Sequence, residues 1–535
     1  MVDTKVTSTH DVEYVDDVSI DENIKGNVQE AQVFSAAMEE ALRKDKPQPW
    51  SKGMIKLYLI LAVGYLCSAT NGFDANTFGG VLAMPNFNDF FNSHGGSTQG
   101  LIASIYVIGN MIGSLPPGPM ADAWGRKVPI AVGSFVAVIG IILQAAAQNT
   151  SMLIGGRFLL GFGVGFVQST GPAYCIELAH PAYRGILVGL YQSCFFVGTI
   201  LTTWLEFGLY YIGDSPVTWR FPLAFQCVPS VIILCFIYWC PDTPRWYMSK
   251  GQDEKALEIL AKYHADGNRE SPIVTFQMAE IRAAIDAEDT GKRWFDIRDF
   301  LFTKSGRYRL FLLWAVAWFS QLDLPPTSYY FPIMVKTAGI TNVRIQLLLN
   351  AIQTPIMFVC AITGSRFAVD SMGRRKLFIL ASTGMTLSLI VITACSALQE
   401  GRPAVGGTGI AFLYVFLVTF SFGWTPLQAL YSSEILSTEW RTRGLAIYNL
   451  LTNCAGFINT YVPPVAIQNV GYRFYIFYIV WDVVGIITIY FTFVETRGRT
   501  LEEIEEIFKD PHPVRFSKQK QTVLINESGD VYMAE

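Results

Sequence analysis

Two charged residues lie inside long apolar stretches of this chain, and together they could exchange a proton. They are Asp74 in one stretch and Arg157 in another. A carboxylate at the centre of a membrane costs about 2.5–3.5 kcal/mol on insertion scales, so it normally faces a cavity or a partner. One interpretation is a structural ion pair. The other is a proton site, in which Asp74 is protonated in one state and Arg157 stabilises its charged form in another.

Neutral polar and aromatic residues in other apolar stretches could bind a polyhydroxylated solute. Gln192 and Gln321 each offer two donors and an acceptor, which suits the alternating pattern of sugar hydroxyls. The alternative for each is a packed hydrogen bond between helices. Flat faces for a ring could come from Tyr329, Tyr330, Phe331 and Trp424, which could equally be core or lipid contacts. Pro325-Pro326 removes two backbone donors, and a helix broken at such a point is where transporters place substrates.

A set of charged motifs occurs twice, about 250 residues apart. Asp122-Ala-Trp-Gly-Arg-Lys127 returns as Asp370-Ser-Met-Gly-Arg-Arg375, and Glu177 with Arg184 returns as Glu434 with Arg441. A chain of two like halves, with charges at matching helix ends, is typical of a secondary transporter. We expect these residues to form a cytoplasmic gate of salt bridges between the halves, which closes in one state and opens in the other. The gate residues are Asp122, Arg126, Glu177, Arg184, Asp370, Arg374, Glu434 and Arg441.

The elements that must position these residues are membrane helices. The chain has 535 residues, of which 51% are hydrophobic and 16% charged, against roughly a quarter charged in soluble domains. Its apolar windows are about 20 residues long, the length that spans a bilayer, and they lack the alternation of a barrel. The sequence predicts an all-α membrane protein with twelve transmembrane helices in two pseudo-symmetric six-helix bundles. The boundaries are a disordered tail at 1–52, a first bundle at 53–240, a loop at 241–308, a second bundle at 309–496 and a tail at 497–535.

The distribution of Lys and Arg predicts the orientation. These residues are concentrated in the connections that follow the even-numbered spans, which places both termini and the long loop in the cytoplasm. Within that loop, Glu254–Tyr263 and Phe276–Asp286 carry apolar residues at helical spacing with charges opposite. We therefore expect helices that lie at the cytoplasmic face and brace the two halves.

Composition also excludes several classes of function. A net charge of −4 argues against nucleic acid as a partner, and none of the nine cysteines forms a Cys-x-x-Cys pair. The five histidines lie in tails or loops, so no intramembrane pair is available for haem or a metal. With no evident nucleophile, metal cluster or nucleotide loop, the sequence predicts neither an enzyme nor a cofactor.

Several motifs, taken together, make the chain resemble the sugar porter family of the major facilitator superfamily, from the first span to about residue 508. Besides the repeated motifs, they are Gly156-Arg-Phe-Leu-Leu-Gly161, Pro172-x-Tyr-x-x-Glu177, Pro241-Asp-Thr-Pro-Arg-Trp246 and Val494-Glu-Thr-Arg-Gly-Arg-Thr-Leu-Glu-Glu503. The segment 245–264 and Ser328-Tyr-Tyr330 are similar to fungal lactose permease and hexose transporter relatives.

This resemblance implies alternating access, in which two bundles rock around a central site. In proton-coupled members, residues matching Asp74 and Arg157 form the coupling pair, and a Gln matching Gln192 touches the sugar. The seventh helix departs from the family: it keeps Gln321, lacks the Ser-Gly-Asn of family members, and adds Asp323. Asp323 could bind hydroxyls, take part in proton traffic or cap the broken helix. In the eleventh helix we take Asn453 as a further candidate for the substrate site.

The leading hypothesis is therefore a porter of a sugar, either a hexose or a disaccharide such as lactose, or of a related polyol. It would work by proton symport across a plasma membrane. A second hypothesis is a porter of the same fold for a non-sugar solute, such as a hydroxylated acid or secondary metabolite. A third is a nutrient sensor that does not transport, which the short segment after about residue 510 disfavours. The expected partners are the solute, protons and the lipid bilayer.

Overall fold

The structure is a computed structural model of the whole chain. It describes residues 48–91, 95–288, 301–323, 327–337, 339–398, 402–436, 441–497, 499, 501–518, 522–525 and 531–534.

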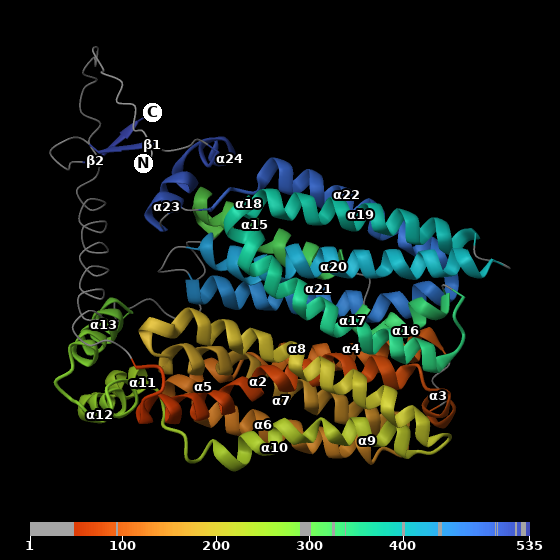
Figure 1. Cartoon of the computed structure of the whole chain (residues 1–535), viewed down its shortest axis with the longest axis horizontal. Helices are drawn as coiled ribbons and strands as arrows, with labels where there is room; N and C mark the ends of the chain where they lie inside the picture. The colour runs from red at the N-terminus through yellow and green to blue at the C-terminus, as the bar shows by residue number, and fades with distance from the viewer. Residues whose placement is uncertain are drawn as a thin grey trace, which may run out of the picture.

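The first half of the chain forms a bundle of long helices with short helices at their ends (Figure 1). Its helices are α2 (Lys52–Leu82), α3 (Pro85–Phe91), α4 (Gly96–Gly113), α5 (Pro117–Trp124), α6 (Lys127–Ala145), α7 (Thr150–Leu178), α8 (Arg184–Leu209), α9 (Val217–Phe225) and α10 (Cys227–Phe236). The single-turn helices η1 (Pro181–Tyr183) and η2 (Tyr210–Ile212) flank α8.

The second half repeats this arrangement. Its helices are α15 (Lys304–Leu322), α16 (Thr327–Thr337), α17 (Val343–Thr363), α18 (Val369–Met372), α19 (Arg374–Leu398), α20 (Pro403–Glu434), α21 (Arg441–Val470) and α22 (Phe474–Thr492). A π-helical turn, η3 (Gly364–Ala368), joins α17 to α18, and η4 (Gly471–Arg473) joins α21 to α22. Pro325-Pro326 lies outside the described residues, in the short segment between the end of α15 and the start of α16.

Short elements gather at one end of both bundles, which we call the loop end (Figure 1). They are α11 (Pro244–Ser249), α12 (Asp253–His264), α13 (Pro272–Glu288), α23 (Leu501–Lys509) and α24 (Pro513–Phe516). The helices α12 and α13 confirm the two amphipathic segments predicted in the loop. Beyond α24, β1 (Thr522–Ile525) and β2 (Val531–Ala534) pair antiparallel. The opposite end, where α3 and the start of α4 lie, is the far end.

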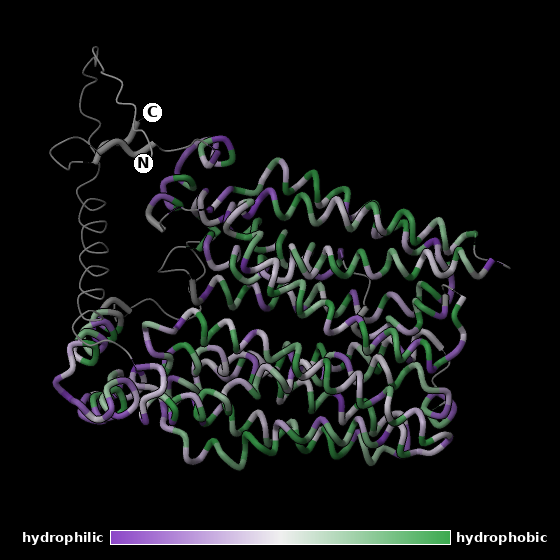
Figure 2. The backbone as a smooth tube through the Cα atoms, in the orientation of Figure 1, coloured by the Kyte–Doolittle hydropathy of each residue, from purple (hydrophilic) through white to green (hydrophobic). Residues whose placement is uncertain are grey.

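The long helices are apolar enough to cross a bilayer. Within the described residues, ten helical segments meet the requirements of length and hydropathy, and one of these, Arg443–Thr492, contains both α21 and α22. Neither α15 nor α16 qualifies alone, yet together they make one further crossing, which agrees with the predicted twelve-helix fold. Figure 2 shows apolar residues along the helices and hydrophilic residues concentrated at their ends. Large apolar side chains such as Phe135 and Phe491 face outward, at 59% and 68% exposure, where lipid would cover them.

Within the first bundle, small residues bring the helix backbones close together. A Cβ added at Gly163 of α7 would lie 2.5 Å from the carbonyl oxygen of Gly133 on α6, and one added at Gly161 would lie 2.1 Å from the carbonyl oxygen of Tyr106 on α4. Membrane helices associate through this kind of close packing because lipid supplies no hydrophobic force between them. It holds α7, which carries Arg157, at the centre of the bundle.

The two bundles meet along a seam formed by α4 with α21, α8 with α17, and α2 with α16. At the far end, the backbone N–H of Gly96 donates to Oε1 of Gln468 at 2.6 Å. A Cβ added at Gly100 would lie 2.6 Å from the carbonyl oxygen of Tyr461. The structure is thus a conformation whose seam is closed at the far end.

Candidate functional site

Asp74 and Arg157 are brought together in the interior of the first bundle. Their exposed fractions are 1% and 0%, and each lies within electrostatic range of the other. Nε of Arg157 donates to the carbonyl oxygen of Ile102 at 2.8 Å, and its guanidinium carbon lies 3.9 Å from the ring centroid of Phe78. Among the described residues, both carboxyl oxygens of Asp74 and both Nη atoms of Arg157 are buried without a hydrogen-bond partner. The two groups are therefore neighbours that do not form an ion pair in this conformation.

Gln192 lies on the face of α8 that is directed toward the second bundle. One turn later on the same face, the ring of Phe196 lies 5.5 Å from that of Phe358 on α17. Further along, the hydroxyls of Thr203 and Thr354 form a hydrogen bond of 3.2 Å across the seam. Gln192 itself is exposed.

Gln321 lies on the other side of the seam. Its Oε1 is 3.5 Å from the position of a Cβ added at Gly456 on α21, and Val107 of α4 lies close to the same point. Its backbone carbonyl oxygen accepts a hydrogen bond of 2.5 Å from Nδ2 of Asn459. The structure thus places both predicted glutamines at the boundary between the bundles.

The two adjacent tyrosines of α16 have different surroundings. The hydroxyl of Tyr330 is buried and donates to the carbonyl oxygen of Thr460 at 2.9 Å. Tyr329 is partly buried and lies within electrostatic range of both Asp74 and Arg157. An element of the second bundle therefore reaches the charged residues of the first.

Three other predicted substrate residues have a partner or neighbour within the second bundle. Trp424 is fully buried, and its Nε1 donates to Oγ of Ser382 at 3.1 Å between α20 and α19. Nδ2 of Asn453 donates to the carbonyl oxygen of Asn449 in its own helix at 3.0 Å. Asp323 is fully buried and faces Asp482 of α22.

Two intramembrane carboxyl groups, those of Glu206 and Asp482, are not among the site residues predicted from the sequence. Both have 0% exposure, and their carboxyl oxygens find no hydrogen-bond partner in the described part of the chain. Glu206 packs against α2, where a Cβ added at Gly80 would overlap its carboxyl group at 1.9 Å. Both could have been identified from the sequence, since each is an acidic residue within a predicted membrane span.

The predicted gate residues pair within each bundle rather than between bundles in this conformation. Arg126 contacts Asp122 at 3.0 Å and Glu177 at 3.3 Å in the first bundle. In the second, Arg374 contacts Glu434 at 2.8 Å. These pairs hold together the helix ends of one bundle, which is why they do not bridge the seam here.

The remaining gate residues have other surroundings or cannot be described. Arg184 contacts Glu280 of α13 at 3.6 Å and so ties the loop helices to the first bundle. The side chains of Asp370 and Arg441 lie outside the described residues.

Each of these ionic clusters is closed by an acidic residue from the segment that follows its bundle. A carboxylate oxygen of Asp242 accepts from the backbone N–H of Arg126 at 2.9 Å, and one of Glu495 accepts from that of Arg374 at 2.8 Å. The glycine before each arginine has a positive φ, 91° at Gly125. A side chain there would be strained and would collide with the carboxylate. We call each such arrangement a carboxylate clamp.

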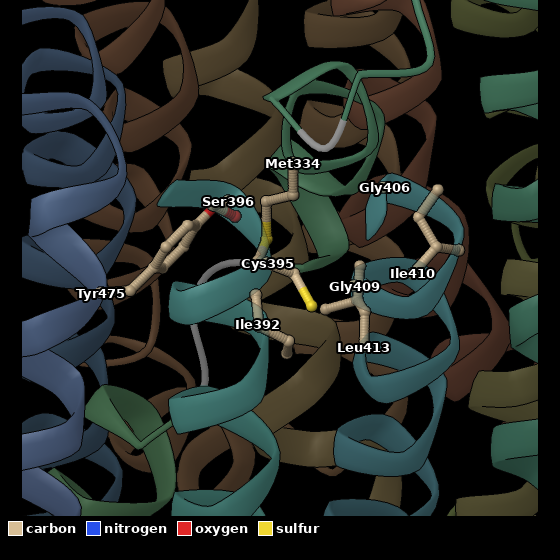
Figure 3. A pocket seen from close by; sticks show the side chains of 9 residues that line it. All are labelled: Met334, Ile392, Cys395, Ser396, Gly406, Gly409, Ile410, Leu413 and Tyr475. Carbon is tan, nitrogen blue, oxygen red and sulfur yellow. The ribbon is translucent and has the colours of Figure 1, made fainter. Parts of the chain in front are cut away.

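A small hollow in the second bundle is not a substrate site. It lies between α16, α19, α20 and α22, with Met334, Cys395 and Tyr475 in its wall (Figure 3). It holds about 10 Å³, no more than one water requires, and its wall is mostly apolar. The polar candidates at the seam are elsewhere.

Comparison with known proteins agrees with this architecture. The family model described as "Sugar (and other) transporter" matches residues 60–508. A high-affinity glucose transporter of Kluyveromyces lactis is 29% identical over 481 residues, covering 85% of this chain and 86% of the relative. A quinate permease of Neurospora africana is 27% identical over 493 residues, covering 88% and 91%.

Solved structures share the fold. The inward open conformation of the xylose transporter XylE from E. coli matches with a TM-score of 0.70 at 22% identity, covering 84% of this chain and 99% of that one. The family match extends over most of the chain and over both bundles. The protein is therefore a multi-pass membrane transporter rather than an enzyme, and it belongs to the sugar porter family of the major facilitator superfamily, the family that its motifs resemble.

Proposed function

We propose that this transporter moves a sugar or related polyol together with protons across a plasma membrane by alternating access. The loop end is cytoplasmic, so the conformation described above is inward-facing, and both termini belong to the cytoplasmic side, as the distribution of Lys and Arg predicts. The glucose transporters among its relatives support a sugar as the solute. The two seam glutamines support a solute rich in hydroxyl groups, because each amide both donates and accepts hydrogen bonds.

The observation that supports proton coupling is the buried carboxyl group of Asp74 beside Arg157. It has no hydrogen-bond partner in the described part of the chain. An ionised carboxylate without a hydrogen bond is strongly disfavoured in such a place, so the carboxyl group carries a proton here. When water enters from the loop end, the proton can leave, and the guanidinium of Arg157 then stabilises the carboxylate. A membrane potential of about 100 mV contributes roughly 2.3 kcal/mol per charge moved, which can drive uphill uptake.

The test is transport by the Asp74→Asn variant in a transporter-deficient host, with mono- and disaccharides offered at two pH values. The amide keeps the shape of the protonated acid but carries no transferable proton. We expect accumulation to be lost while exchange of internal for external solute persists. The matched control is Asp214→Asn, which alters an exposed acid at the far end. Normal uphill uptake by the Asp74 variant would remove this residue from the coupling mechanism.

A second candidate solute is a hydroxylated acid. The quinate permeases among the relatives support it, and so does the loss of Ser-Gly-Asn from the seventh helix. The same uptake screen includes quinate as one solute. Uptake of quinate without uptake of any sugar would decide for this alternative.

A further inference from the structure

Two acidic side chains meet inside the second bundle, away from the seam. Asp323 is the residue that follows α15, and Asp482 lies in the middle of α22. The two helices pack where the ring of Phe319, one turn before Asp323, lies 5.4 Å from that of Trp481. A Cβ added at Gly485 would lie 3.2 Å from the same Phe319 ring. This packing brings the two carboxyl groups within interaction distance of each other.

No donor from elsewhere in the described part of the chain reaches this carboxyl pair. Both side chains have 0% exposure, and all four carboxyl oxygens lack a hydrogen-bond partner there. Two tyrosine hydroxyls on the neighbouring helices α22 and α16 are engaged with other atoms. The hydroxyl of Tyr478 donates to Oδ1 of Asn459 at 2.8 Å, and that of Tyr330 donates to the carbonyl oxygen of Thr460.

Among the described residues, no cation compensates the pair either. The basic residue of α15 nearest in sequence, Arg309, is almost four turns away, and its guanidinium lies over the ring of Phe508 at the loop end. The other ionisable group within electrostatic range of the pair is Tyr478, whose own ionisable neighbours include Tyr475 of α22 and Tyr330 of α16. Two ionised carboxylates cannot remain in contact in a site without water, a donor or a cation. Two carboxyl groups that share a site keep a proton.

We propose that Asp323 and Asp482 form a second proton-binding site, separate from Asp74, which must hold at least one proton for the end of α15 to pack on α22. A displacement of Asp323 would act on α16, because Asp323 is close in sequence to the start of α16 at Thr327. The tyrosines of α16 contact α21 and approach Arg157. Loss of the proton would leave like charges in contact and push the end of α15 away from α22. The site would thus link protonation of the second bundle to the position of α16.

The first test measures the melting temperature of the purified protein as the pH is raised from mildly acidic to mildly alkaline. The variants are Asp323→Asn, Asp482→Asn and the double variant, with Asp214→Asn as the exposed control. The folded pair holds protons that the unfolded chain releases, so stability must fall as the pH rises. We expect the unmodified protein and the control to share an alkaline loss of melting temperature, and the double variant to lose part of that dependence.

Two results would overturn the proposal. One is an unchanged pH dependence in the double variant. The other is failure of both single Asn variants to fold, because an amide has the shape and charge of the protonated acid and must be tolerated if that form is native. This measurement requires no transport, so it stands even if the proposed solute is wrong.

A second measurement tests the link to α16. The proposed function predicts that the Asp74→Asn variant still exchanges internal for external solute. This exchange is measured at the same pH values. We expect exchange to weaken at alkaline pH in this variant and to resist alkaline pH when Asp482→Asn is added. Equal alkaline loss in both would refute the link to α16. If no solute is exchanged by any variant, the proposed solute is wrong, and the melting curves still decide the proton site.

Discussion

Closure of the far end depends on a glycine that admits a neighbouring backbone, and this gives a prediction with a worked magnitude. In Gly100→Ala, the added methyl carbon would lie 2.6 Å from the carbonyl oxygen of Tyr461, well inside van der Waals contact. Overpacking of this kind typically costs about 1–3 kcal/mol. The cost falls on the conformation that is closed at the far end, because only there do α4 and α21 meet so closely. We expect the balance to shift toward the far-end-open state by roughly 5- to 150-fold.

The accessibility of one native cysteine, Cys454, can report this shift toward the far-end-open state. Sγ of Cys454 lies in the seam, 3.9 Å from Sδ of Met111. In a background with the other cysteines replaced, a membrane-impermeant maleimide added outside the cell reaches Cys454 only when the far end opens. Gly100→Ala should therefore increase its labelling rate several-fold. The matched control is Gly189→Ala in α8, where an added Cβ meets nothing within 4 Å, so labelling should not change. Equal labelling in the two variants would refute the tight far-end contact.

Three further predictions concern the pocket, the loop end and the loop helices. Gln192→Ala should raise the apparent Michaelis constant for the solute with normal surface expression, and unchanged uptake kinetics would assign Gln192 to packing. Glu434→Gln removes a charge-assisted contact with the half-buried Arg374, so we expect a loss of about 1.5–3 kcal/mol in stability. The same change at Glu254, whose side chain is 73% exposed in its ion pair with Arg269, should cost less than about 1 kcal/mol. Melting curves that show equal losses of stability for the two variants would contradict this ranking. Burial lowers the pKa of His264 from its ordinary 6.5, so its contribution to stability is complete above that pH and is lost as the pH falls below it. Amide exchange in α12 should therefore rise on acidification, and His264→Gln should flatten that response.

Burial and the proximity of His264 and Arg184 lower the pKa of the neighbouring His180 to about 3. The two imidazole rings lie 5.0 Å apart. His264 also donates through Nε2 to the carbonyl oxygen of Leu178 at 3.1 Å, and its Nδ1 contacts the side-chain amide of Gln277 at 2.8 Å. The attachment of the loop helices to α7 thus depends on uncharged imidazoles, which is why an acid-dependent loosening is expected there.

Much of the fold could be predicted because membrane spans and amphipathic helices leave clear patterns. The segment predicted at Glu254–Tyr263 is α12, Asp253–His264, and charged residues at its ends mark its limits. The last span of the first bundle is predicted as one helix and is one candidate crossing, Val217–Phe236, within which α9 and α10 are separated at Gln226. The Oε1 of Gln226 accepts from Nε2 of Gln144. A buried amide pair of this kind cannot be inferred from one segment, since the partner lies on another helix.

The candidate site was harder to predict, because a membrane helix is apolar on every side. In a soluble protein the apolar face of a helix indicates its rotation, but here lipid and core select similar residues. Trp424 and Asp323 have suitable chemistry and depth for a pocket, yet their helices turn them toward Ser382 and Asp482 inside the second bundle. Gln192 and Gln321, by contrast, lie on helices that form the boundary between the bundles, and their binding of the solute stays a prediction. The spatial pairing of Asp323 with Asp482 joins residues about 160 positions apart and leaves no local signal.

The carboxylate clamps have a consequence for biosynthesis. Asp242 closes the ionic cluster of the first bundle, and the ribosome delivers it about 250 residues before Glu495, which does the same for the second. The first half can thus complete its own locking contacts while its counterpart is still being translated. A nascent chain truncated just before Asp242 would lack that contact, whereas one released shortly after it already contains every residue of the cluster.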